Sequence, residues 1–63
     1  MAPLIGITTG YRTVASGEGQ TRAHSLYPDY TAMVRRSGGM PVALVPVDEP
    51  AGIVDRIDGL VMT

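Results

Sequence analysis

Three side chains near the middle of the chain have the residue types of a hydrolytic triad. His24, Ser25 and Asp29 lie within six residues of one another. A triad needs a nucleophile, a base and a carboxylate that converge in space, whereas residues this close together, on both sides of a helix start, point in different directions. Ser25 is better explained as a helix N-cap and Asp29 as a first-turn carboxylate that complements the helix dipole. We therefore expect His24 to be a loop residue rather than a general base.

Two other patterns have residue types that could do chemistry. Asp48 and Glu49 could form an acid and base pair, but adjacent acids before a helix usually cap it and complement its dipole. Gly17-Glu18-Gly19 matches the beginning of a dinucleotide fingerprint, yet position 22 is arginine and no strand directly precedes the motif. The spacings of a P-loop and of a G-x-S-x-G elbow are also missing. We assign no catalytic residue to these 63 residues.

The composition limits the classes of function further. The chain has no cysteine and one histidine, so it offers no disulfide, no cysteine nucleophile and no zinc cage, and we expect neither a metal nor a cofactor. Five arginines against six acidic residues give a net charge of -1, which argues against nucleic acid as a partner. No apolar stretch approaches the ~20 residues of a membrane span and no signal peptide is visible, so we expect a cytoplasmic protein that does not bind membranes.

Three short apolar runs without alternation predict strands buried on both faces. They are residues 4–8, 40–45 and 59–63. Residues 9–24 are rich in Gly, Ser and Thr and are predicted to be one long loop.

Two helices are predicted between these strands. Leu26, Tyr30, Met33 and Val34 share one helical face, so the first helix should extend from Leu26 to Ser37, with Ser25 as its cap and Gly38-Gly39 as its stop. The second should begin at residues 48–50 and continue to about Ile57.

The predicted order is therefore βαβαβ, which is typical of a parallel sheet in an α/β protein. Three strands and two helices cannot cover both faces of such a sheet. Domains of this size also bury only ~60% of the surface that the unfolded chain exposes. We interpret residues 1–63 as the N-terminal part of a single larger domain that is incomplete at its C-terminus, and the rest of the polypeptide as its necessary partner.

Ligands of open parallel sheets bind at the carboxyl ends of the strands. Thr9, Gly10 and Tyr11 follow the first strand, and Tyr27 lies near the start of the first helix. We predict these four residues as substrate-binding residues, with the loop over residues 9–24 as a lid or pocket wall. The alternatives are that the loop is a solvated insertion and that the ring of Tyr27 only packs.

Three segments in this order resemble a known family. They are PLIGITT at residues 3–9, residues 27–30 leading to RRSGGMPVALVP at 35–46, and IDGLVMT at 57–63. Together they are similar to the opening third of the gamma-glutamyl-gamma-aminobutyrate hydrolase family, in the class I glutamine amidotransferase-like superfamily. The resemblance covers nearly the whole chain except the variable loop from about Arg12 to Ala23.

The resemblance implies a flavodoxin-like parallel sheet with helices on both faces. It also implies a hydrolase that cleaves gamma-glutamyl amide bonds of small-molecule substrates with a cysteine nucleophile, assisted by histidine and glutamate, all beyond Thr63. In that family the third strand leads into a glycine-rich turn that helps to form the oxyanion hole, and this sequence stops just before it. Activity would therefore belong to the full-length parent, either alone or as a homodimer.

The alternative function is a non-catalytic flavodoxin-like or receiver-like module that binds a ligand. Receiver domains need an acidic cluster after the first strand and an aspartate at the end of the third. Here those positions are Thr8-Thr9 and Met62-Thr63, which favours the hydrolase.

Overall fold

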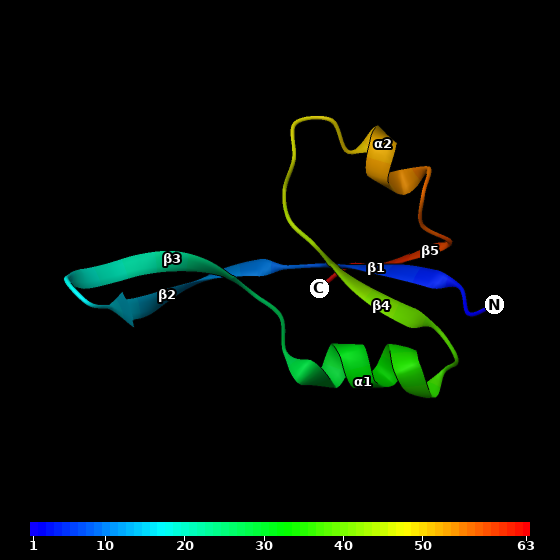
Figure 1. Ribbon diagram of the computed structural model, residues 1–63, viewed down its shortest axis with the longest axis horizontal. Coiled ribbons are helices and arrows are strands. Elements are labelled where there is room, and N and C mark those ends of the chain that lie inside the picture. The colour runs from blue at the N-terminus through cyan, green and yellow to red at the C-terminus, as the bar shows by residue number, and fades with distance from the viewer.

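The computed structural model describes residues 1–63 and contains a three-stranded parallel sheet. Strand β1 (Leu4–Thr8) lies in the centre, between β4 (Met40–Leu44) and β5 (Gly59–Val61) (Figure 1). The three strands predicted from the apolar runs are confirmed. Strand β4 ends one residue earlier than predicted, and β5 ends two residues earlier. Pro41 is tolerated because β4 is an edge strand of this sheet, where a missing N–H donor does not break a ladder on both sides.

Helix α1 (Pro28–Arg36) is shorter at its start than predicted. Its N-cap is Tyr27 and no side chain caps it, so the prediction that Ser25 is the cap was wrong. The reason is Pro28, because a residue that precedes proline avoids the helical region, and Tyr27 is extended with φ -71° and ψ 137°. The predicted end is confirmed: Arg35 and Arg36 lie in the last turn and Gly38 follows with φ 95°.

Helix α2 (Ala51–Val54) is a single turn that ends before Ile57. Its N-cap is Pro50, no side chain caps it, and its first turn contains no acidic residue. Asp48 and Glu49 therefore precede the helix without capping it, contrary to the prediction. Figure 1 shows α1 and α2 on opposite sides of the sheet.

The prediction of a loop over residues 9–24 was wrong. Strands β2 (Gly10–Ser16) and β3 (Gly19–Ser25) pair as an antiparallel hairpin, with Gly17 and Glu18 between them. A two-residue connection that begins with glycine is a hairpin signal. The chain is therefore a mixed α/β structure in which a hairpin separates β1 from α1, rather than a simple βαβαβ series.

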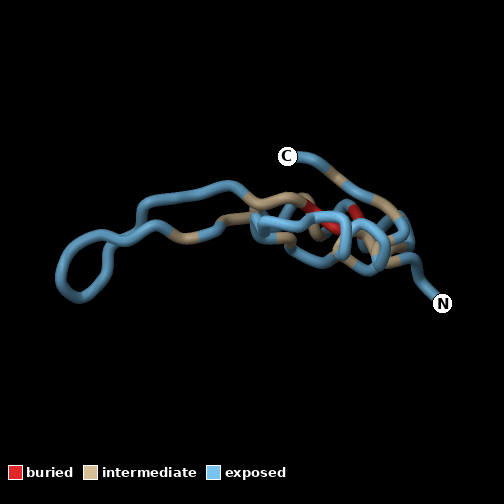
Figure 2. Tube along the Cα trace, turned by 90° about the horizontal axis from the view of Figure 1, so that it is seen from above, coloured by how far each residue is buried: buried red, intermediate tan, exposed pale blue.

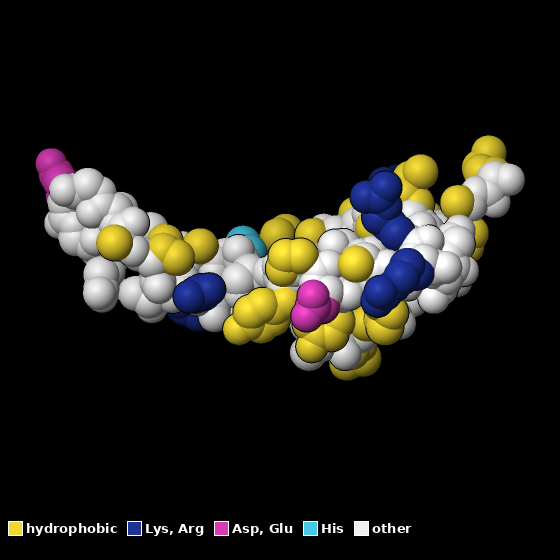
Figure 3. Space-filling model, turned by 90° about the horizontal axis from the view of Figure 1, so that it is seen from below, with side chains coloured by type: hydrophobic (Ala, Val, Ile, Leu, Met, Phe, Trp, Pro, Cys, Tyr) yellow, Lys and Arg dark blue, Asp and Glu magenta, His cyan; other side chains and the backbone are white.

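The hairpin projects away from the sheet and its helices (Figures 1 and 2). The molecule accordingly measures 44 × 28 × 17 Å along its principal axes. Only Gly6, Ile7 and Val34 are buried. Hydrophobic side chains are also at the surface on the face seen in Figure 3. Neither helix has the length and hydrophobicity that a membrane span requires.

Candidate functional site

The carboxyl ends of all three parallel strands meet at one edge of the sheet. Thr8 ends β1, Leu44 ends β4 and Val61 ends β5. Because the strands are parallel, the segments that follow them leave the sheet at this same edge, where open α/β sheets bind their ligands.

Threonine hydroxyls join the three strand ends at this edge. Thr9 Oγ1 donates to the Leu44 carbonyl oxygen at 2.8 Å. The Thr63 backbone N–H donates to Thr8 Oγ1 at 2.9 Å, and Thr63 Oγ1 donates to the Thr8 carbonyl oxygen at 2.8 Å. The Thr9 hydroxyl is therefore already engaged with the backbone of β4, which uses its only donor hydrogen.

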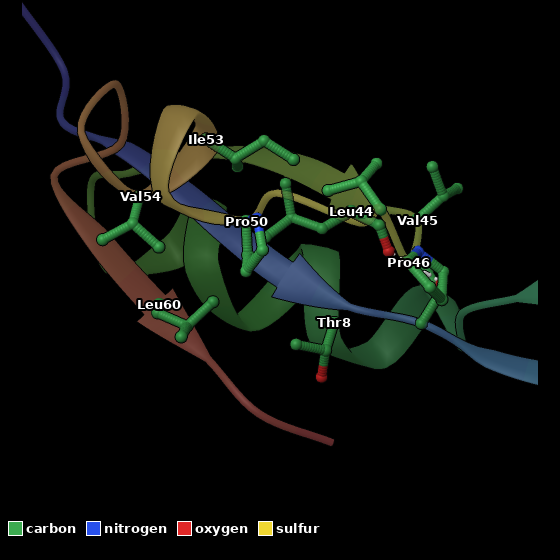
Figure 4. A pocket seen from close by; sticks show the side chains of 10 residues that line it. Thr8, Leu44, Val45, Pro46, Pro50, Ile53, Val54 and Leu60 are labelled. Atoms are coloured by element: carbon green, nitrogen blue, oxygen red, sulfur yellow. Dashed lines mark hydrogen bonds between the residues drawn. The ribbon is translucent and has the colours of Figure 1, made fainter.

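An apolar pocket, here called the α2 pocket, opens on the α2 side of this edge (Figure 4). Its volume is about 250 Å³. The lining residues come from β1, from the end of β4 and the segment after it, from α2 and from β5: Thr8, Thr9, Leu44, Val45, Pro46, Val47, Pro50, Ile53, Val54 and Leu60. Its polar side chains are Thr8 and Thr9, so it suits an apolar group better than a charged one. Sequence reasoning missed this pocket, although the apolar run Val45-Pro46-Val47 continuing past the strand end was its signal.

A second pocket of about 230 Å³, here called the α1 pocket, lies at the same end of the molecule beside α1. It is lined by Gly10, Ser25, Leu26, Tyr27, Tyr30 and Thr63. Four of these residues carry hydroxyl groups, which can donate or accept hydrogen bonds to a polar ligand. The backbone of Gly10 and Ser25 comes together because these two residues pair at the base of the hairpin.

The structure brings together only two of the four predicted substrate-binding residues. Gly10 and Tyr27 line the α1 pocket, whereas Thr9 lines the α2 pocket. Tyr11 lines neither pocket and is 52% exposed on the hairpin. Its ring lies beside that of His24, with 4.7 Å between the centroids.

The residues of the rejected triad do not assemble. His24 and Ser25 are consecutive in β3, so their side chains point to opposite faces of the hairpin. Asp29 lies in the first turn of α1. The prediction that His24 is a loop residue was wrong, since it pairs with Tyr11 in the hairpin ladder. No three or more of the histidine and acidic side chains gather in a way that could hold a metal ion.

Comparison with known proteins identifies the family. The sequence model of the family described as peptidase C26 matches residues 3–63, which is nearly the whole chain. No curated protein and no solved structure shows significant similarity to the chain. The family match begins just before β1 and includes the hairpin, both helices and β5. This chain therefore belongs to the peptidase C26 family.

Proposed function

We propose that this chain is the N-terminal segment of a glutamine amidotransferase-like hydrolase that cleaves gamma-glutamyl amide bonds. The observation that carries the proposal is the peptidase C26 match over residues 3–63. The parallel sheet, with two pockets at the carboxyl edge of its strands, is compatible with a small-molecule substrate.

The proposed reaction is acyl transfer through a thioester. A cysteine thiolate attacks the gamma-carbonyl carbon, and the C–N bond breaks as the departing amine takes up a proton. Water then hydrolyses the thioester, which releases the gamma-glutamyl group as glutamate and regenerates the thiol. The nucleophile would lie outside residues 1–63, since they contain no cysteine.

The role proposed for this chain is to build one side of the substrate site. Gly10 and Tyr27 would contact substrate in the α1 pocket, Thr9 would border the α2 pocket, and Tyr11 would act from the hairpin. Tyr27 lines the α1 pocket and is 69% exposed, and its hydroxyl can donate or accept a hydrogen bond. Under this proposal the remainder of the polypeptide completes the site and the enzyme acts in the cytoplasm.

The test is hydrolysis of a panel of gamma-glutamyl amides by the full-length enzyme, followed as release of glutamate. Tyr11→Ala and Tyr27→Ala should each lower kcat/KM by about 10-fold, as expected for one lost contact worth ~1.4 kcal/mol. Arg36→Ala is the matched control, because Arg36 lies in the last turn of α1, far along the helix from Tyr27. Equal and negligible effects of all three substitutions in folded protein would remove these tyrosines from the site.

Calorimetry on the same protein distinguishes the hydrolase from the alternative function, a non-catalytic ligand-binding module. Titration with flavin mononucleotide or adenine nucleotides should give no tight binding if the protein is a gamma-glutamyl hydrolase. Tight nucleotide binding without glutamate release would overturn the proposal.

A further inference from the structure

The β2–β3 hairpin stands apart from the rest of the chain. It packs against no other helix or strand, and every residue of β2 is exposed. A two-stranded hairpin of this kind is marginally stable at best in water, so the contacts between its own side chains matter. The most concentrated of these contacts involve Tyr11, Arg22 and His24, which we call the hairpin cluster.

The register of the hairpin places the three side chains on one face. Tyr11 pairs with His24, and Arg22 pairs with Thr13, two residues along the ladder. The tyrosine and histidine ring planes are tilted by 39°. The guanidinium carbon of Arg22 lies over the tyrosine ring, 4.2 Å from its centroid, which is within the range of a cation–π interaction.

No carboxylate is placed to neutralise Arg22 from within the hairpin. The only acidic residue between Gly10 and Ser25 is Glu18, in the turn. The Ser16–Gly19 pair that flanks this turn is three pairs from Arg22 in the ladder, or roughly 10 Å at ~3.4 Å per residue. None of the side-chain hydrogen bonds of the structure involves the hairpin cluster.

These features leave a pre-oriented guanidinium without an acceptor. The contact with the Tyr11 ring restricts the Arg22 side chain, while the guanidinium N–H groups that do not face the ring stay available. An edge with two parallel donors matches the two oxygens of a carboxylate. The imidazole of His24 carries an N–H group that can donate from the same face.

We propose that Tyr11, Arg22 and His24 form a binding site for the carboxylate group of a small-molecule ligand. Arg22 would bind both carboxylate oxygens, Tyr11 would hold the guanidinium in place, and His24 would donate from the side. This site shares Tyr11 with the proposed function, but its test is separate, because carboxylate binding requires no nucleophile.

The test follows the ring signals of His24 by NMR in the full-length protein, at fixed pH and ionic strength. These signals are assigned by their loss in His24→Gln. Glutarate is the probe, and its uncharged diamide is the control for the carboxylate. The His24 signals should shift saturably with glutarate and stay in place with the diamide.

Arg12 provides a matched control on the same hairpin. It pairs with Ala23, so it points to the face opposite Arg22 while carrying the same charge. Arg22→Gln should weaken glutarate binding by about tenfold or more, as for the loss of a charge-assisted bidentate contact. Arg22→Lys keeps the charge but not the two parallel N–H donors, so it should also weaken glutarate binding. Arg12→Gln should change the affinity for glutarate by less than about twofold.

Three results would overturn the proposal. The first is the absence of a saturable shift in the unsubstituted protein. The second is an equal loss in Arg12→Gln and Arg22→Gln, which would indicate only general attraction to a basic hairpin. The third is tighter binding of inorganic phosphate than of glutarate at the same ionic strength, which would assign the cluster to another anion.

Discussion

Thr63 donates two hydrogen bonds to Thr8, although 55 residues separate them in the sequence. The Thr63 N–H donates to the Thr8 hydroxyl, and the Thr63 hydroxyl donates to the Thr8 carbonyl oxygen. The ladder between β1 and β5 ends at the pair Ile7 and Val61. Thr8 and Thr63 therefore extend the connection between β1 and β5 beyond the last pair of the ladder, and each of the two hydrogen bonds uses one threonine hydroxyl.

Replacement of Thr8 by valine should remove the hydrogen bond that the Thr63 N–H donates to the Thr8 hydroxyl, while keeping the shape of the side chain. We expect a loss of about 1 kcal/mol in the free energy of unfolding of the full-length protein, the usual contribution of one hydrogen bond. Thr31→Val is the control, since its hydroxyl only donates to Pro28 within α1. Urea denaturation measures the free energy of unfolding of both variants. The double variant Thr8→Val/Thr63→Val should lose less free energy of unfolding than the two single variants lose in sum. Strict additivity would show that the two threonines are not coupled.

A methyl group added at Gly39 should destabilise the protein. A Cβ there would lie 2.8 Å from Ile5 Cγ1 and 3.0 Å from Val34 Cγ1, and Val34 is buried. We expect Gly39→Ala to cost about 1–3 kcal/mol, as for overpacking of a core. Gly52→Ala in α2 is the opposite case, because its Cβ meets nothing within 4 Å and alanine favours a helix by about 0.5–1 kcal/mol. Equal denaturation midpoints for these two variants would contradict the packing at Gly39.

Ile7 should be the most sensitive hydrophobic position of the chain. It is the one large side chain with no exposed surface. We expect Ile7→Val to cost about 0.5–1.5 kcal/mol and Ile7→Ala about 2–5 kcal/mol. Val14→Ala, at an exposed position of the hairpin, should cost far less. Urea unfolding of the full-length variants checks the order, and a cost for Val14→Ala as large as that for Ile7→Ala would contradict it.

Residues 1–63 expressed alone should not form a stable monomer. Only three residues are buried, while twelve large hydrophobic side chains are exposed, among them Val42, Val45 and Leu60 of the sheet and the segment after β4. We expect aggregation or partial order, because uncovered sheet faces and unpaired strand edges promote association. Calorimetry with light scattering tests this. A cooperative thermal transition of a monomer would contradict it.

Local residue patterns were sufficient to predict the parallel strands and the end of α1. β-branched and apolar runs bounded by Gly and Pro predict β1, β4 and β5, since these residues favour extended backbone and burial wherever they lie. Arg35, Arg36 and Gly38 predict the end of the helix because they act on the last carbonyl groups directly. The start of α1 was placed two residues too early because the preference of Tyr27 for extended backbone before Pro28 was given too little weight.

The hairpin was missed because it buries almost nothing. Most of its residues are polar, and all except Ala23 and Ser25 are exposed, so no apolar alternation marks the strands. The signal that could have found it is the two-residue connection Gly17-Glu18 between segments of equal length.

The amino-acid sequence by itself determined the three parallel strands, the end of α1, the absence of a cysteine nucleophile within residues 1–63 and the resemblance that pointed to the hydrolase superfamily. Only the tertiary structure decided which side chains meet. It separates Thr9 from Gly10 and Tyr27, unites Gly10 with Tyr27 in the α1 pocket, and places Arg22 over Tyr11. The physical reason is that a local pattern specifies the conformation of its own segment, whereas a pocket depends on register and crossovers between segments that are far apart in the chain.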